Sequence, residues 1–362
     1  MNNNDFLMCT FEKNNYMKFS VILLLIFLSL VSSCETDVKP IDNVVEDTVV
    51  IVKPIDSLNF LSTAIQGNTQ NAKLWFDRAN YFMRQGSISD ALIDMTSAVR
   101  LDSVNAIYRV KLADLQVSSL KLEGALDNYE YVLSIDSANA NAYVGMGRVF
   151  ALLNNPGMAT GYLNKAYQIN PHLSEAYFLE GLIYRADYDE TKREESIKRA
   201  LSSFQTATEQ KPDFYAAYIE MGVINHRMGN DIALDYYNTA IDIAPKSIEA
   251  WYNKGMYFQD KKMYSEARTC YKTISDIDSL NSNALYNQGY IKMLFEKDLD
   301  SAIYFFNYVT QLDTNHFNAY NNLGLSLERK GEIEKAKNAY RKAIDINPDF
   351  KLAKKNLNFI SK

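Results

Sequence analysis

Apolar and polar residues alternate along this chain with the period of short amphipathic helices that come in pairs. The pattern is clearest in residues 317–350. Each half of this segment carries apolar or small residues three and four positions apart, which places them on one face of a helix. Gly331 lies between the halves, where glycine readily takes the left-handed conformation that ends a helix, and Pro348 follows the second half, which it cannot continue. The first stripe consists of Tyr320, Leu323, Gly324 and Leu327, and the second of Ala336, Tyr340 and Ala343.

The same helix–turn–helix pattern recurs eight times. The second copy departs most, because Arg109 and Gln116 stand where the other copies favour aromatic residues. The fourth copy is seven residues longer than the last, with its excess in residues 186–195, which fit either a solvated extension of the helices or a partner contact. The fifth copy has a turn one residue short, and the seventh has one extra residue in its turn. The eight segments are 72–105, 106–139, 140–173, 174–214, 215–247, 248–281, 282–316 and 317–350.

One such hairpin cannot bury its apolar face alone, but stacked neighbours can. The spacing of aromatic residues, glycine, alanines and proline in these segments resembles the tetratricopeptide repeat (TPR). The resemblance implies an all-α fold, a right-handed α-solenoid of about eight TPR helix-turn-helix repeats over residues 57–362. We expect a half-repeat cap at 57–71, repeats over 72–350 and a C-terminal capping helix at 351–362.

The N-terminus has the pattern of an export signal. Phe19–Val31 is a mostly apolar run, too short for a comfortable transmembrane helix and typical of a signal peptide over residues 1–33, with a possible late start at Met17. Val31 and two serines precede Cys34, which resembles the bacterial lipobox, in which the cysteine receives the lipid. An ordinary signal peptide with a chance cysteine, or a short membrane anchor, also fits.

Residues 34–56 lack a helical period and form the expected linker after the lipidated cysteine. They contain Pro40 and Pro54, each inside a copy of the string Val-Lys-Pro-Ile-Asp. An extended tether between the membrane and the repeats fits this composition. A short strand-pairing or partner segment at residues 49–52 is the alternative.

Composition and motifs favour an interaction protein over an enzyme. The net charge of −6 gives no sign of general nucleic-acid affinity. The sequence has no Gly-rich phosphate loop, no metal-spaced Cys/His cluster and no nucleophile elbow. We therefore expect no enzyme activity, no metal, no cofactor and no small-molecule substrate. Cys270 is expected to be buried and inert, and His172 and His316 to be solvated in loops between repeats.

The resemblance places a partner-binding groove on the first helix of each repeat. Arginines there suggest an extended peptide with acidic and aromatic side chains. Alternatively, they favour the helix dipole and bury their stems. Asparagines at equivalent positions in the last three repeats resemble a ladder that holds a peptide backbone, although asparagine is also common there. The candidate groove residues are Phe76, Arg84, Arg148, Phe178, Arg185, Arg227, Tyr252, Asn253, Tyr286, Asn287, Tyr290 and Asn322.

These observations predict a non-catalytic scaffold or adaptor anchored by lipid at the bacterial outer membrane or in the periplasm, with surface exposure as a further option. Its partners would be envelope proteins or extended peptides, with a role in outer-membrane assembly, secretion or motility machinery. The alternative is a periplasmic holdase chaperone that binds unfolded proteins through the aromatic groove.

Overall fold

The computed structural model describes residues 57–361, and within them the chain is all helical and contains no β-strand. The predicted signal peptide, the lipobox cysteine Cys34 and the linker lie outside the described residues. The chain divides into two compact units, of which the first ends at Ala216 and the second begins at Ala217. The fold class predicted from the sequence is confirmed, because paired helices recur through both units.

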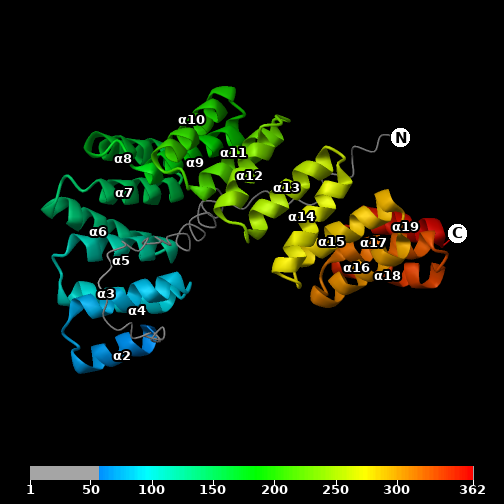
Figure 1. The fold of residues 1–362 in the computed structure, drawn as a ribbon, viewed down its shortest axis with the longest axis horizontal. Helices are drawn as coiled ribbons and strands as arrows, with labels where there is room; N and C mark the ends of the chain where they lie inside the picture. The colour runs from blue at the N-terminus through cyan, green and yellow to red at the C-terminus, as the bar shows by residue number, and fades with distance from the viewer. Residues whose placement is uncertain (1–56, 362) are drawn as a thin grey trace, which may run out of the picture. The chain divides into compact units, whose positions relative to one another are not determined.

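The first unit begins with the single helix α2 (Ser57–Gly67), which packs on the first of four helical hairpins. The second helix of each hairpin packs on the first helix of the next, so the hairpins stack in chain order (Figure 1). The hairpins are α3 (Ala72–Arg84) with α4 (Ile88–Leu101), α5 (Ala106–Ser118) with α6 (Leu122–Ile135), α7 (Ala140–Leu152) with α8 (Pro156–Ile169), and α9 (Ser174–Thr191) with α10 (Glu194–Gln210).

The second unit repeats this arrangement and ends with the single helix α19 (Lys351–Ile360), which packs on the last hairpin. A single helix therefore stands before the first described hairpin and another after the last. The hairpins of the second unit are α11 (Tyr215–Arg227) with α12 (Ala233–Ile243), α13 (Ile248–Asp260) with α14 (Tyr264–Ile277), α15 (Ser282–Ile291) and η2 (Lys292–Glu296) with α16 (Leu299–Leu312), and α17 (Phe317–Arg329) with α18 (Ile333–Ile346).

Each described hairpin turns through one residue in the left-handed backbone region. Three of these residues are glycines, for which the conformation has little cost. The other five have side chains, for which it costs roughly 1–2 kcal/mol. The geometry of the turn therefore imposes a positive φ even on residues that disfavour it. The residues are Gly86, Leu120, Asn154, Lys192, Gly229, Lys262, Lys297 and Gly331.

The two helices of a hairpin approach closely where small residues meet a ring. In the last hairpin, Gly324 of α17 lies against the ring of Tyr340 of α18, and Ala336 and Tyr340 are fully buried. Met293 and Phe306 of the preceding hairpin join the same core cluster. Apolar burial at about 25 cal/mol per Å² thus acts both within and between hairpins.

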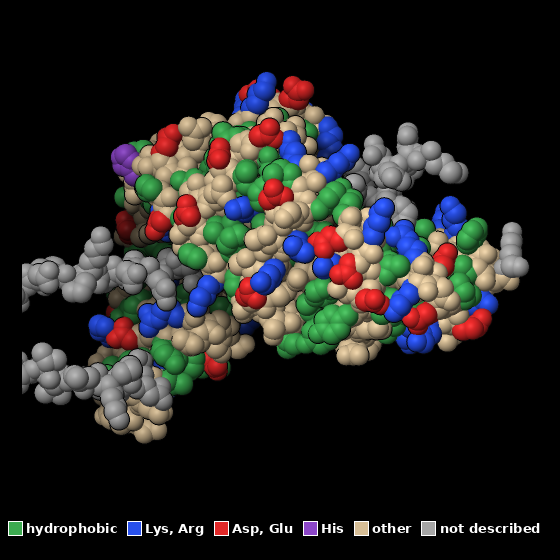
Figure 2. Space-filling model, turned by 45° about the vertical axis from the view of Figure 1, so that its right-hand side comes forward, with side chains coloured by type: hydrophobic (Ala, Val, Ile, Leu, Met, Phe, Trp, Pro, Cys, Tyr) green, Lys and Arg blue, Asp and Glu red, His purple; other side chains and the backbone are tan. Residues whose placement is uncertain are grey.

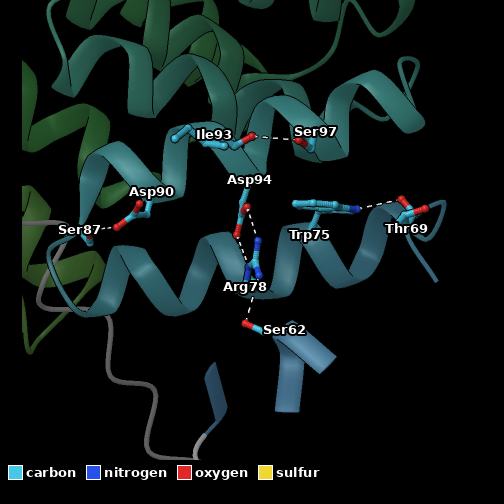
Figure 3. A network of polar contacts seen from close by, with 9 residues as sticks. All are labelled: Ser62, Thr69, Trp75, Arg78, Ser87, Asp90, Ile93, Asp94 and Ser97. Carbon is cyan, nitrogen blue, oxygen red and sulfur yellow. Dashed lines mark hydrogen bonds and ion pairs between the residues drawn. The ribbon is translucent and has the colours of Figure 1, made fainter. Parts of the chain in front are cut away.

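A polar network fixes α2 to the first hairpin (Figure 3). The Arg78 guanidinium donates two hydrogen bonds to the Asp94 carboxylate, at 2.7 and 2.9 Å, and a third to the Ser62 hydroxyl on α2 at 3.1 Å. The guanidinium also lies over the Trp75 ring, at 5.2 Å. Because the Asp94 side chain is only 3% exposed, its charge depends on Arg78 for compensation.

A second polar network explains the divergence of the second repeat. Arg109 stacks on the Tyr131 ring, 3.6 Å from its centroid, and donates to the Asn128 side-chain oxygen at 2.9 Å. Asn128 in turn donates to the Gln116 side chain at 3.0 Å. Arg109 and Gln116 therefore replace an aromatic contact by a hydrogen-bonded one.

The insertion in the fourth repeat is a helical extension. α9 has 18 residues and α10 has 17, against 13 and 14 in the preceding hairpin. The turn between them is made by Lys192 in the left-handed region. Residues 186–195 thus lengthen both helices of this hairpin, and a partner contact by this extension stays a prediction.

The extra residue of the seventh repeat is absorbed by the π-helical turn η2. Insertion of one residue into an α-helix commonly produces such a turn. Phe295 then stacks on Tyr264, and Glu296 pairs with Arg268 at 2.8 Å. Both contacts reach the second helix of the preceding hairpin.

Candidate partner-binding surface

The predicted groove residues differ widely in their accessibility. Most lie on the first helices of the hairpins and are half-buried. Arg84 and Arg227 are exposed, in the last turns of α3 and α11, where a positive charge also favours the helix dipole. Phe178, Asn287 and Asn322 are buried. The half-buried residues are Phe76, Arg148, Arg185, Tyr252, Asn253, Tyr286 and Tyr290.

Arg148 is engaged within the protein. Its guanidinium pairs with the Asp114 carboxylate at 3.2 Å, and the same carboxylate oxygen accepts a hydrogen bond from the Tyr129 hydroxyl at 2.7 Å. Burial, together with the negative charge of Asp114, raises the pKa of Tyr129 well above its usual value. Arg148 therefore links two neighbouring hairpins, and a partner carboxylate would have to compete with Asp114.

The aromatic side chains predicted for the groove are held by other rings. Phe178 is fully buried between Phe204 and Phe214, with ring centroids 5.5 and 4.9 Å away. Phe76 stacks on Tyr108 of the next hairpin at 4.6 Å. Phe178 thus belongs to the core of the first unit, and Phe76 is only partly available to a partner.

The asparagines predicted to form a ladder connect consecutive repeats. Asn322 donates to the Tyr286 hydroxyl at 2.9 Å, and Asn287 forms a hydrogen bond with Tyr252. One repeat further along, Asn356 donates to the Asn321 side-chain oxygen at 3.1 Å. A ladder is present, but each rung joins two helices of this protein. Asn253, which is half-buried, occupies the equivalent position one repeat earlier.

Three buried tyrosines of the second helices have side-chain acceptors that the sequence pattern did not identify. Tyr340 donates to Glu328 at 2.6 Å, and Tyr271 to Gln259 at 3.3 Å, each twelve residues earlier. In the second repeat the acceptor is Asp114, fifteen residues before Tyr129. Each acceptor lies on the first helix of the same hairpin, twelve or fifteen residues before its tyrosine, so the sequence spacing gives the helix but not the residue.

His316 is not a solvated loop residue. Its Nδ1 accepts a hydrogen bond from the Ala319 backbone N–H at 3.1 Å, so His316 caps the N-terminus of α17. Its ring also stacks on Tyr286 at 5.0 Å. Burial lowers the pKa of His316 below its usual value. The neutral ring is therefore the form that caps the helix.

Cys270 matches its prediction. The side chain is buried, and burial raises the pKa of the thiol to about 11. Because the thiolate is the reactive form, this thiol is unreactive at neutral pH. Over residues 57–361, no group of three or more His, Cys, Asp and Glu side chains is arranged to hold a metal ion. Within the same span, no helix is both long and apolar enough to cross a membrane.

Comparison with known proteins agrees with this architecture. Residues 317–350 and residues 248–279 each match a family model described as tetratricopeptide repeat. A chain in the crystal structure of the APC/C hetero-tetramer Cut9-Hcn1 covers 84% of this chain and 58% of its own length, with a TM-score of 0.54 and 16% sequence identity. The fold is a TPR solenoid. At this identity the likeness concerns the fold alone.

Two curated proteins that are similar to this chain in sequence carry names that place them in protein assemblies. The BBSome complex member BBS4 of Bos taurus is 26% identical over 206 residues, which cover 57% of this chain and 38% of BBS4. The mitochondrial import receptor subunit TOM70 of Rattus norvegicus is 22% identical over 235 residues, which cover 61% of this chain and 37% of TOM70. The chain spans less than two fifths of the length of either relative.

Proposed function

We propose that this protein is a non-catalytic scaffold that binds protein partners and is held at the bacterial envelope by a lipid on Cys34. The stack of TPR hairpins carries the proposal, because such stacks present long surfaces built from the first helices of successive repeats. The names of BBS4 and TOM70, a complex member and an import receptor subunit, support a role in protein assembly. Outer-membrane assembly, secretion or motility machinery is the proposed setting.

Burial narrows the set of candidate residues that a partner can reach. In the first unit these are Arg84, which is exposed, and Phe76 and Arg185, which are half-buried. In the second unit the exposed Arg227 is followed along the first helices by the half-buried tyrosines of the candidate set. An extended peptide with acidic and aromatic side chains suits this chemistry.

The anchor is tested by Cys34→Ala in intact cells. We expect the wild-type chain in the membrane fraction and the variant in the soluble fraction, because the thiol is the site of lipid attachment. Equal membrane fractions for the two proteins would refute the anchor and leave the scaffold function untouched.

The binding surface is tested by crosslinked recovery of partners from cells. Arg84, Arg185 and Arg227 are all changed to Ala, and Lys198→Ala on the exposed face of α10 serves as the matched control. Partners recovered with the wild type and the control but lost with the triple variant would support the proposal. Recovery of the same partners with all three proteins would show that these arginines do not bind the partner. Suppression of the aggregation of unrelated proteins, without a saturable partner, would favour the holdase alternative.

A further inference from the structure

The last hairpin and the helix before it carry an open groove that none of the predicted partner-binding residues lines. Its floor is formed by α17 and its walls by α16 and α18, and its volume is about 480 Å³. The floor residues Tyr320, Leu323 and Leu327 and the wall residues Ile303 and Ala339 make it largely apolar. A groove of this size accommodates more than one bulky side chain.

The third repeat shows what fills the equivalent space elsewhere in the chain. There, Tyr162 of α8 stacks on Phe150 of α7 at 5.3 Å with the rings nearly parallel, and on Tyr143 at 6.4 Å. The equivalent positions of the last repeat are occupied by Ala339, Leu327 and Tyr320. Two of the three rings are therefore missing, and the groove lies where they would be.

The other hairpins fill these two positions in their own ways. The position of Ala339 is aromatic in three repeats, as Tyr162, Tyr236 and Phe305. The position of Leu327 is aromatic in four repeats, as Phe82, Phe150, Tyr184 and Phe258, and the third repeat is aromatic at both positions. In the second repeat both positions are polar and hydrogen-bonded to each other, as Gln116 and Asn128. The last repeat has neither a ring nor a polar pair at these two positions.

The rim of the groove is basic. Lys335, 74% exposed, and the exposed Lys342 stand on the α18 side. The one carboxylate on the rim, Glu332, is paired with Lys335 at 2.7 Å and with Lys330 at 3.5 Å, and these contacts lower its pKa. Residues 330–361 hold eight Lys and Arg against four Asp and Glu, in a chain whose net charge is −6. This end therefore attracts acidic groups.

We propose that this groove is a second docking site, which takes an aromatic side chain of a partner protein from a segment rich in Asp and Glu. The partner ring would take the place of the Tyr162 ring of the third repeat. Its flanking carboxylates would face Lys342 and, in competition with Glu332, Lys335. The inference rests on the proposed scaffold function and adds a separate binding site to it. The scaffold would then hold two partner proteins, or two segments of one partner protein.

The test is a selection of random twelve-residue peptides displayed on phage, against the purified full-length chain. We expect enrichment of peptides with an aromatic residue flanked by acidic residues. The groove is then filled from within by the double change Leu327→Phe and Ala339→Tyr, which copies the third repeat. We expect the enriched peptides to bind the filled variant at least tenfold more weakly, with far-UV circular dichroism showing an unchanged helix content.

A second variant keeps the test decisive if the filled one fails to fold. Lys335→Glu with Lys342→Glu alters only exposed side chains, and it should weaken the same peptides severalfold and reverse the preference for acidic flanks. The triple arginine variant described above should bind these peptides as well as the wild type, so a failure of one site is distinguishable from a failure of the other.

Three results would overturn the proposal. The first is a selection in which peptides with an aromatic residue and acidic flanks are not enriched. The second is equal binding of the selected peptides by the wild type and the filled variant. The third is sedimentation of the wild type as a dimer and of the filled variant as a monomer, which would show that a second copy of this chain occupies the groove.

Discussion

The close approach of the two helices at Gly324 gives the sharpest prediction for stability. A Cβ atom at this position would lie 2.7 Å from two atoms of the Tyr340 ring. Carbon atoms in contact are normally separated by about 3.5–4.0 Å, so the ring would have to retreat by roughly 1 Å. Tyr340 is fully buried, and its hydroxyl is held by Glu328 at 2.6 Å. The ring therefore has little freedom to move.

Two opposing terms decide the effect of Gly324→Ala. Replacement of glycine by alanine inside a helix stabilises it by about 1 kcal/mol. Overpacking of a filled core costs about 1–3 kcal/mol. We expect the overpacking to dominate and the variant to lose up to about 2 kcal/mol in the free energy of unfolding of the last repeat.

Gly161→Ala is the matched control. Gly161 lies within α8, and a Cβ there would meet no atom within 4 Å. Only the favourable helix term then remains, so this variant should be more stable by up to about 1 kcal/mol. Hydrogen exchange of the α8 and α18 amides measures the local effects, and urea unfolding followed by circular dichroism measures the total. If both variants are stabilised alike, the packing argument at Gly324 is wrong.

Three further predictions concern a turn, a cap and an ion pair. Leu120→Gly should raise the urea midpoint, by about 1 kcal/mol in unfolding free energy, because Leu120 has a positive φ of 56°, and Gly86→Ala should lower it by a similar amount. The lowered pKa of His316 means that the unfolded state binds a proton at this side chain more readily than the folded state, so stability should decrease as the pH falls below ~6.5. His316→Asn should keep the cap of α17 and reduce this pH dependence. Thermal melts of both proteins at pH 5 and 8 would measure the difference. Arg78→Ala should cost about 3 kcal/mol, since it leaves the buried Asp94 charge uncompensated, and a loss below ~1 kcal/mol in urea unfolding would contradict this account.

Much of the fold follows from local sequence pattern. The stripes of apolar residues predict the helices, and their 34-residue recurrence predicts the stacking, because every hairpin needs a neighbour to bury its open face. The departures in length at residues 186–195 and in the seventh turn were visible in the same way. Their forms, a longer hairpin and a π-helical turn, depend on backbone hydrogen bonding that residue types do not specify.

The candidate site was predictable only in part. Arg84 and Arg227 are exposed as expected, because they lie in the last turns of their helices. Position within one repeat could not show that Asn322 reaches Tyr286, or that Arg148 meets Asp114, since both contacts cross to a neighbouring repeat. Binding of a partner by the accessible residues stays a prediction.

The sequence by itself determined which residues form helices, where they turn and which faces are apolar, because these properties depend on residues three to four positions apart. Only the tertiary structure decided which polar side chains are already engaged and where a core position is left unfilled. The groove beside Ala339 shows the difference: alanine is an ordinary helix residue, and the space becomes apparent only beside the Tyr162 stack of the third repeat. Whether a side chain is buried, and whether a space beside it stays unfilled, depends on which side chains the neighbouring helices bring to the same place.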